Sequence, residues 1–267
     1  KGKGDPAVLR LLDAAEHRGH ALLVFPFLPM NLRECLHKFG RNVGINLRAV
    51  RSYARQLLGA LQHLKRHGVV HADIKPDNIL VTGDYAGVVL CDFGNAFRET
   101  DADAAAPTPY LVSRFYRPPE VVLGLEYDGA VDLWGITVTL YELFTGRVMF
   151  PGASNNDMLH RFMDTLGPFS HKMLRRHFLG YEALALPPHF ERGTYAFRHV
   201  DADRATGRPV TRVVAVGAPG APLTRRLAGH AGPEDDAADV RAFGELVGRC
   251  LALDPARRVD AGEALRH

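Results

Sequence analysis

The 267-residue sequence lacks the features of a disulfide-stabilised or membrane-embedded protein. It has few cysteines, Cys35, Cys91 and Cys250, which are odd in number and show neither a CxxC pair nor metal-ligand spacing. Such cysteine usage is typical of a protein kept in a reducing compartment. No apolar run reaches the roughly 20 residues of a membrane-spanning helix, and the N-terminus lacks the charged-then-apolar pattern of a signal peptide. We therefore expect a protein that is neither secreted nor bound to a membrane.

The sequence also has little net charge. The formal charge is +3, and the arginines are spread along the chain rather than clustered, so direct nucleic-acid binding is not indicated. No HExxH motif occurs among the 13 histidines. The hydrophobic content of 46% is sufficient for a substantial core.

Two short motifs carry the strongest chemical signal, HADIKPDNIL at residues 71–80 and CDFGNA at residues 91–96. Phosphoryl transfer needs a carboxylate near the substrate hydroxyl, a cation near the transferred phosphate and oxygen ligands for Mg²⁺. The motifs supply these groups in order: Asp73, Lys75, Asn78 and Asp92. Each residue alone is more often a turn or a helix cap, but the combined spacing favours a phosphoryl-transfer site.

The two motifs resemble the HRDxKxxN catalytic loop and the DFG metal loop of eukaryotic protein kinases. The resemblance implies that ATP and Mg²⁺ are the cofactors. It makes Asp73 the catalytic base, Lys75 the partner of the γ-phosphate, and Asn78 and Asp92 the Mg²⁺ ligands. Phe93 would set the position of the metal loop. A lysine two residues after the base is typical of serine/threonine kinases.

The resemblance also implies an α+β protein-kinase-like fold, with a mainly α-helical large lobe and a remnant of the β-rich small lobe. Only 24 residues precede Phe25, too few for the glycine-rich loop, strand lysine and helix glutamate of a small lobe. We expect residues 1–28 to be the end of the small lobe with the hinge, and residues 29–267 to be the large lobe. As a fragment, this chain is expected to bind Mg·ATP weakly and to transfer no phosphate by itself.

The segment 92–120 resembles a kinase activation segment and contains TPYLVSRFYRPPE. In the CMGC group of kinases a tyrosine here is phosphorylated and held by arginines four and seven residues later, the spacing of Tyr110, Arg114 and Arg117. A phosphate would gain charge-assisted contacts from both guanidinium groups. The alternative is a solvated loop with ordinary surface arginines. Ala72 takes the place of an arginine that, in most of these kinases, couples the catalytic loop to the phosphorylated segment.

Within the CMGC group, HAD followed by PYLVSRFYR and preceded by MNLRE is similar to the pre-mRNA processing factor four kinases, which are nuclear serine/threonine kinases of the spliceosome. The likeness is strongest over residues 22–156. It implies protein substrates, splicing factors among them, and a nuclear location, with the cytoplasm as the alternative. We expect a monomer.

The run FPFLP resembles the hinge that binds adenine through main-chain groups, here those of Pro26 and Leu28. The resemblance implies a nucleotide pocket lined by Phe25, Pro26, Leu28, Asn31, Leu80 and Cys91, with Asn31 near the ribose. Simple core or turn packing is the alternative for all six residues.

Apolar spacing predicts a helix over residues 47–67, capped by Asn46, and a second helix from residue 128 or 129 to residue 145. The second helix is apolar nearly all round, as a buried central helix must be. Its Asp132 must be hydrogen-bonded or paired to persist in a buried helix. The resemblance to kinases implies that Asp132 holds the catalytic-loop backbone near His71 and Ala72. By resemblance to kinases, Glu120 and Arg258 form a buried ion pair.

Residues 168–236 take the place of the CMGC insert, and residues 216–237 are predicted to be a long mobile loop. This loop would dock partners or would simply be solvated.

Three functions stay open. The first is an active serine/threonine kinase whose upstream part is not in this chain. The second is an inactive kinase-like scaffold, and the third is a related CMGC enzyme such as a dual-specificity tyrosine-regulated kinase. The four intact phosphate-handling residues favour the first, whereas the small lobe missing from these residues favours the second.

Overall fold

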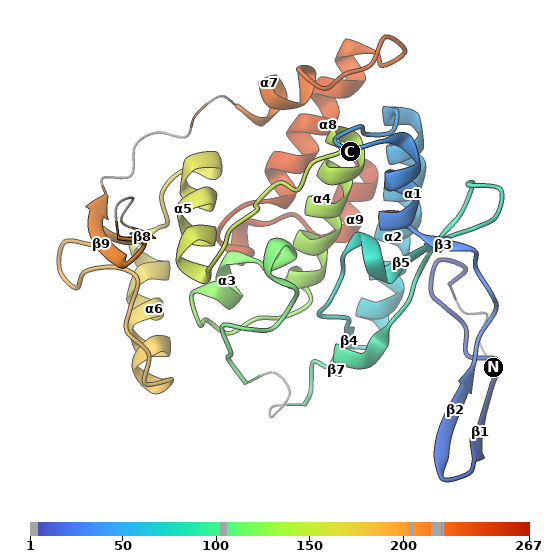
Figure 1. The fold of residues 1–267 in the computed structure, drawn as a ribbon, viewed down its shortest axis with the longest axis horizontal. Helices are drawn as coiled ribbons and strands as arrows, with labels where there is room; N and C mark the ends of the chain where they lie inside the picture. Colours follow the sequence, from blue (N-terminus) through green and yellow to red (C-terminus); the bar gives the residue numbers. More distant parts are fainter. Residues whose placement is uncertain (1–4, 102–105, 203–205, 215–219, 221) are drawn as a thin grey trace.

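A computed structural model describes residues 5–101, 106–202, 206–214, 220 and 222–267. Its helices are α1 (Leu32–Phe39), α2 (Leu47–Arg66), α3 (Pro119–Val122), α4 (Ala130–Thr145), α5 (Asn155–Leu166), α6 (His171–Ala183), α7 (Leu223–Ala228), α8 (Ala237–Cys250) and α9 (Ala261–Arg266). Its strands are β1 (Asp13–His17), β2 (His20–Val24), β3 (Met30–Asn31), β4 (Val69–Val70), β5 (Ile79–Val81), β6 (Val88–Leu90), β7 (Phe97–Arg98), β8 (Phe197–Ala202) and β9 (Pro209–Val214). Short 3₁₀ turns are η1 (Pro76–Asn78), η2 (Phe93–Asn95), η3 (Arg114–Tyr116) and η4 (Pro255–Arg257). The predicted α+β class with a mainly helical body is confirmed (Figure 1).

Helices α2 and α4 pack together at the centre of the body. The Asn46 side chain caps α2 by accepting a hydrogen bond from the amide of Ala49, and Gly68, with φ 61°, follows the last turn. Almost every residue of α4 is buried, because the helix is apolar on nearly all sides. Both predicted helices are confirmed to within two residues at each end.

Gly135 allows α4 to lie against the catalytic loop. A Cβ atom at this position would lie 3.0 Å from the carbonyl oxygen of Ile74 and 3.1 Å from its Cβ. A residue with a side chain would push the two segments apart. The glycine therefore brings the central helix close to the residues that carry the candidate chemistry.

Two small antiparallel sheets hold the ends of the catalytic loop. Strand β4 pairs with β7, and β5 lies between β3 and β6. The register of β5 with β6 places Ile79 opposite Leu90. Asn78 and Cys91, the residues just outside this pair, are joined by a backbone hydrogen bond of 3.0 Å. The two polar motifs of the sequence therefore meet at the same end of the sheet.

The β1–β2 hairpin extends away from the helical body (Figure 1). All of its residues are exposed, and the following Phe27 is 91% exposed. Residues 21–27 are apolar at most positions, but strand pairing stops at Val24, opposite Asp13. Pro26 lacks an amide hydrogen and cannot continue the ladder.

The stretch 168–236 contains α6, the β8–β9 hairpin and α7. The long loop predicted for residues 216–237 was wrong for residues 223–228, which form α7; residues 216–219 and 221 lie outside the described part of the chain. Leu227 of α7 is fully buried, and Thr224 lies so close to Gly244 of α8 that a Cβ there would approach it to 2.9 Å. Tertiary packing thus stabilises a short helix that could not be predicted from the surrounding glycine- and proline-rich sequence.

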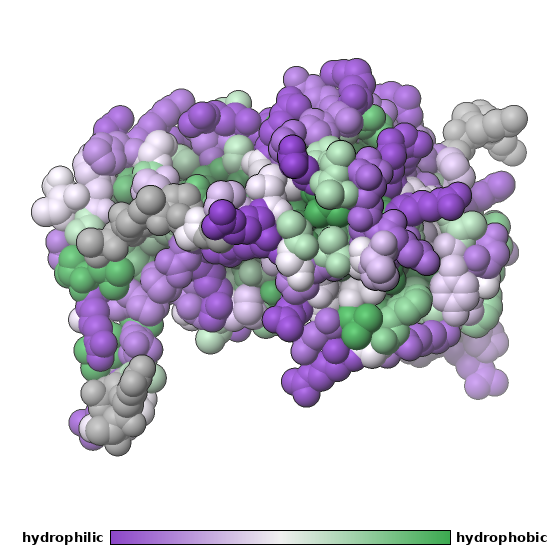
Figure 2. Space-filling model, turned by 90° about the horizontal axis from the view of Figure 1, so that it is seen from above, coloured by the Kyte–Doolittle hydropathy of each residue, from purple (hydrophilic) through white to green (hydrophobic). Residues whose placement is uncertain are grey.

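Hydrophilic side chains cover most of the face seen in Figure 2, with hydrophobic patches scattered among them. Of the helices in the described ranges, none has the length and apolar character that a membrane span requires.

Candidate active site

The catalytic loop between β4 and η1 is held by α4. Its backbone turns at Ala72, which has φ 62°, a conformation that is costly for a residue with a Cβ atom. The carboxylate of Asp132 accepts hydrogen bonds from the amides of His71 at 2.7 Å and Ala72 at 2.9 Å. Burial raises the pKa of Asp132, and nearby His71 and the two amide donors oppose this change. Asp132 thus anchors the loop backbone in the way expected from the sequence.

His71 joins the catalytic loop to the metal loop. Its ring is fully buried, and Nδ1 lies 3.2 Å from the amide of Asp73 and accepts its hydrogen. Nε2 therefore carries the proton that is donated to the carbonyl of Cys91 at 2.9 Å. The same ring lies edge to face with Phe93, at a centroid separation of 4.8 Å. A shift of Phe93 would thus displace the His71 ring, which is hydrogen-bonded to the backbone of the catalytic loop.

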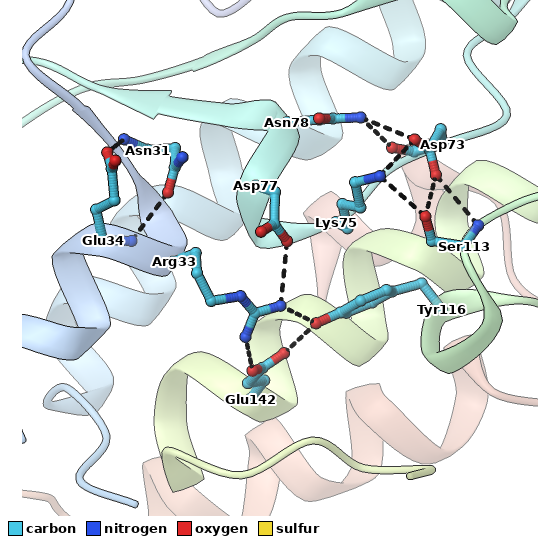
Figure 3. A network of polar contacts seen from close by, with 10 residues as sticks. All are labelled: Asn31, Arg33, Glu34, Asp73, Lys75, Asp77, Asn78, Ser113, Tyr116 and Glu142. Carbon is cyan, nitrogen blue, oxygen red and sulfur yellow. Dashed lines mark hydrogen bonds and ion pairs between the residues drawn. The ribbon is translucent and has the colours of Figure 1, made fainter. Parts of the chain in front are cut away.

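Asp73, Lys75 and Ser113 form a compact polar cluster (Figure 3). The Lys75 ammonium lies 2.7 Å from Oδ2 of Asp73 and 2.9 Å from Oγ of Ser113. Ser113 donates to Oδ1 of Asp73 from its hydroxyl at 2.7 Å and from its amide at 3.1 Å. Burial alone would raise the pKa of Asp73, but the hydrogen bonds from Lys75 and Ser113 outweigh it and lower that pKa. Asp73 is therefore a buried carboxylate that is kept ionised.

Asn78 and Asp92 are placed to offer oxygen ligands to a cation. The Asn78 amide nitrogen donates to the backbone oxygen of Asp73 at 2.9 Å and to its Oδ2 at 3.0 Å. This orientation turns Oδ1 of Asn78 away from Asp73, and no hydrogen bond from the described residues reaches that oxygen. Asp92 is exposed, has φ 63°, and uses Oδ1 to accept from the amide of Gly94 at 3.3 Å. An amide oxygen and a carboxylate are hard ligands, so this pair fits Mg²⁺.

A second polar network joins α1, α4, η1 and η3 (Figure 3). The Arg33 guanidinium contacts Glu142, Asp77 at 3.2 Å and the Tyr116 hydroxyl at 2.5 Å. The same hydroxyl donates to Glu142 at 2.5 Å. Burial opposes the charge on Arg33, but Tyr116 and Glu142 raise its pKa. Asp77 belongs to the turn between Lys75 and Asn78. The network therefore joins the catalytic loop to α1 and α4.

The activation segment contains a well-exposed tyrosine beside two arginines. Tyr110 is 68% exposed, and the Arg117 guanidinium lies over its ring, 5.9 Å from the centroid. Arg117 is buried and donates to the carbonyls of residues 110–112 and to Asn155 at 2.6 Å. Arg114 donates to the carbonyl of Ala153 at 2.9 Å. Burial and the charge of Arg114 lower the pKa of Arg117, so an anion beside these two cations would be stabilised.

Position 72 contributes no cation to this region. Ala72 is fully buried in a small apolar cluster with Val70, Phe97 and Val121. Arg114 and Arg117 thus remain the arginines expected to receive a phosphate on Tyr110.

The ion pair expected between Glu120 and Arg258 is present and is excluded from solvent. The two side chains are 1% and 0% exposed, and the guanidinium grips both carboxylate oxygens at 2.8 and 2.9 Å. Arg258 also donates to the carbonyls of Ala130 and Ala252. This arrangement joins the end of the activation segment to the turn before α9.

The predicted nucleotide-pocket residues are only partly brought together. Asn31 pairs with Leu80 across β3 and β5, and Cys91 lies beside Asn78. The Asn31 oxygen accepts from the amide of Glu34 in a capping box, so in this structure it caps α1. Burial and Asp92 raise the pKa of the Cys91 thiol to about 11, which keeps it neutral.

The remaining three predicted pocket residues lie on the connection from β2 to β3. Phe25 and Pro26 are exposed, and Leu28 is half-buried. Main-chain groups on such a connection are accessible to a ligand.

A comparison with known families decides the identity of this fold. The protein kinase domain model matches residues 2–267. The chain belongs to the protein kinase family.

Several curated kinases are similar to it. The serine/threonine-protein kinase prp4 of Schizosaccharomyces pombe is 41% identical over 94% of this chain and 51% of its own length. The serine/threonine-protein kinase prpf4B of Dictyostelium discoideum is 36% identical over 97% of this chain and 31% of its own length. The dual specificity tyrosine-phosphorylation-regulated kinase 3 of Rattus norvegicus is 31% identical over 99% of this chain and 43% of its own length. This kinase chain thus spans about half, or less, of these relatives.

Sequence reasoning missed two parts of the candidate site. Ser113 was not assigned a role, although it contacts both Asp73 and Lys75. The network of Arg33, Tyr116 and Glu142 was also missed. The available signals were a small hydroxyl residue close before Arg117 and a glutamate in an otherwise apolar helix, but neither identifies its partner.

Proposed function

We propose that this chain supplies the catalytic large lobe of an ATP- and Mg²⁺-dependent serine/threonine protein kinase. The observation that carries the proposal is the cluster of Asp73, Lys75 and Ser113, in which a carboxylate is kept ionised beside a cation. A scaffold protein would have no chemical need for this arrangement next to the oxygen ligands that Asn78 and Asp92 offer.

Each residue has a distinct task in this proposal. Asp73 accepts the proton of the substrate hydroxyl, and Lys75 offsets negative charge on the transferred phosphate. Ser113 fixes the carboxylate and the ammonium relative to each other. Asn78 and Asp92 would hold Mg²⁺, which neutralises the nucleotide phosphates when bound. The backbone between β2 and β3 would receive the adenine.

The substrates and location are proposed from the likeness to the splicing kinases. We propose that the intact protein is a nuclear, monomeric kinase that phosphorylates proteins of the splicing machinery on serine or threonine. The similarity to the prp4 and prpf4B kinases over nearly the whole chain supports this assignment. The 31% identity to a dual specificity kinase supports the dual-specificity alternative, an enzyme that also phosphorylates tyrosine.

The test is a phosphorylation assay with Mg·ATP and a peptide library containing serine, threonine or tyrosine acceptors. The intact protein should phosphorylate serine or threonine peptides, and Asp73→Asn should lower the rate by about 10²- to 10⁴-fold. Asp239→Asn, an exposed site on α8, is the matched control and should not change the rate. The 267-residue chain alone should be inactive, since these residues contain no glycine-rich loop followed by a strand lysine.

Two outcomes would count against the proposal. Phosphorylation of tyrosine peptides at a comparable rate would favour the dual specificity alternative. An intact protein with no activity on any acceptor would favour the scaffold.

A further inference from the structure

A second group of potential ligands lies outside the active site. Asp157 and His160 are three residues apart on α5 and therefore share a face of the helix, and His199 lies on β8. One ligand atom from each of the three residues falls within 4.8 Å of the others. In the described part of the chain, no other group of at least three such side chains has this geometry.

The fold holds His199 opposite α5. The buried side chain of Asn156 donates to the carbonyl of Arg198 at 2.8 Å and accepts from the amide of Val200 at 2.8 Å. These two bonds fix the backbone on both sides of His199. The His160 ring then stacks on His199, with centroids 4.3 Å apart and planes 22° apart. The two imidazoles are thus placed together by buried contacts and not by a chance meeting of surface side chains.

The surrounding groups leave ligand atoms available. The amide of Ala153 and the guanidinium of Arg161 both bind Oδ2 of Asp157, at 2.9 and 3.2 Å. No hydrogen bond from the described residues reaches Oδ1 of Asp157. Asp164 lies 3.8 Å from Nδ1 of His160, four residues further along α5, so its negative charge favours a cation at this position.

We propose that Asp157, His160 and His199 form a binding site for a divalent transition metal, with Zn²⁺ as the preferred ion. Two imidazoles and one carboxylate, with a fourth position for water, form a donor set suited to Zn²⁺. Mg²⁺ and Ca²⁺ prefer oxygen ligands throughout and are disfavoured. In stacked rings the nitrogen lone pairs run nearly parallel and do not converge on one point. Metal binding therefore requires one of the two imidazoles to rotate out of the stack. Asp157 and Asp164 offset the repulsion between the ion and Arg161.

The site would fasten the β8–β9 hairpin to α5. The first turn of α5 also holds the activation segment, because Asn155 donates to the carbonyl of Pro109 at 2.9 Å and accepts from Arg117 at 2.6 Å. A bound ion would therefore stabilise a junction between the insert and the activation segment. This role is separate from phosphoryl transfer and does not depend on it.

The test is a calorimetric titration of the metal-free intact protein with ZnCl₂, and with MgCl₂ for comparison. His199→Phe removes the ligand but keeps an aromatic ring against His160, and should weaken the binding of one Zn²⁺ by about 100-fold or more. Asp164→Asn should weaken it by about tenfold. The matched control is His63→Phe, which alters a histidine pair outside the site. The rings of His63 on α2 and His67 just after it have centroids 4.4 Å apart and planes 39° apart.

Two further readouts keep the proposal falsifiable. Co²⁺ bound in place of Zn²⁺ should give the visible absorption of a four-coordinate site, and His199→Phe should abolish it. Hydrogen exchange in β8, β9 and α5 should slow when Zn²⁺ is added. If His199→Phe does not fold, the isosteric Asp157→Asn takes its place in the titration. The proposal is wrong if the parent protein binds no Zn²⁺, or if the ligand variant binds it as tightly as His63→Phe does.

Discussion

The chemistry of Asp73 depends on a residue that lies far from it in the sequence. Asp73 and Lys75 could be predicted because they share one short motif. Ser113 could not, because it lies 40 residues away and meets Asp73 only when the activation segment folds back over the catalytic loop. Burial of Asp73 would otherwise favour its protonated form. The charge state of the candidate base is therefore a product of the tertiary structure.

We expect Ser113→Ala to leave a larger fraction of Asp73 protonated, and so unable to act as a base, at low pH. The folded-state pKa of Asp73 is lowered partly by the Ser113 hydroxyl, so its removal should raise that pKa towards the ordinary value. The acidic limb of the pH profile of kcat should then move to higher pH, and kcat at neutral pH should fall about tenfold or more because Lys75 also loses a partner. Steady-state kinetics of the intact protein measure both effects. Ser113→Thr, which keeps the hydroxyl, is the control, and an unchanged pH profile in Ser113→Ala would show that Ser113 does not act on Asp73.

At the level of helices and loops, prediction succeeded where the pattern was long and periodic. Helices α2 and α4 were predicted because each buries a long apolar face or is apolar throughout. The short helix α7 was missed because its stability comes from Leu227 packing against the body and not from its own sequence. The role of Asp132 could be predicted because a carboxylate in a buried helix must find donors.

The activation segment gives a test of regulation by Tyr110. Phosphorylation would place a dianion beside Arg114 and Arg117. Tyr110→Phe should therefore lower the activity of the intact protein several-fold. Arg117 also holds the backbone of residues 110–112, so its removal would disturb the fold. By contrast, the Arg114 side chain donates only to the carbonyl of Ala153 among the hydrogen bonds of the described chain.

In an Arg114→Ala background, Tyr110→Phe should have a much smaller effect on activity. Arg175→Ala, an exposed arginine on α6, is the control background and should leave the effect unchanged. A full loss of activity from Tyr110→Phe in the Arg114→Ala background would indicate that the tyrosine acts through packing.

The Glu120–Arg258 pair should dominate the link between the activation segment and the C-terminal turn. Glu120→Gln leaves the Arg258 charge buried without its partner and should lower the free energy of unfolding by ~3–5 kcal/mol. Urea denaturation measures this change. The exposed pair of Glu126 and Arg176 is the control, and Glu126→Gln there should cost about 0–1 kcal/mol. Equal effects of the two substitutions would mean that the buried pair is not the anchor described here.

Across the whole molecule, local motifs predicted the residues of the candidate site, but the contacts that join distant segments had to be seen in the structure. The large-lobe site residues lie together because β5 and β6 bring residues 78 and 91 side by side and α4 supports the loop. The exposed positions of Phe25 and Pro26 on the connection after β2 could not be deduced from their apolar character.

Two histidines of the stretch 168–236, the buried His177 and the half-buried His189, predict a pH-dependent stability for the whole fold. Burial lowers the pKa of His177 and of His189 to about 4, while His177 bonds the carbonyl of Leu123 and His189 lies beside it. The unfolded chain protonates these groups near pH 6.5, so between pH 6.5 and pH 4 it takes up protons that the folded state does not. The free energy of unfolding should fall over this range, by up to ~1.4 kcal/mol per pH unit for each histidine.

Urea denaturation at several pH values tests this dependence. His177→Gln should flatten the fall in stability between pH 6.5 and pH 4, although it lowers stability at neutral pH. His20→Gln, an exposed histidine on β2, should leave the pH dependence unchanged. An equally steep fall in both variants would show that His177 is not responsible.

The most direct test of the assigned site compares two isosteric substitutions, Asp73→Asn and Asp92→Asn, in the intact protein. Mg·ATP affinity is measured by calorimetry and phosphate transfer by single-turnover kinetics. Asp92→Asn should weaken Mg·ATP binding and slow transfer, because it removes a charge that holds Mg²⁺. Asp73→Asn should slow transfer and leave Mg·ATP affinity nearly unchanged, because only the base is lost. If Asp73→Asn weakens Mg·ATP binding as severely as Asp92→Asn does, the roles assigned to these two carboxylates are wrong.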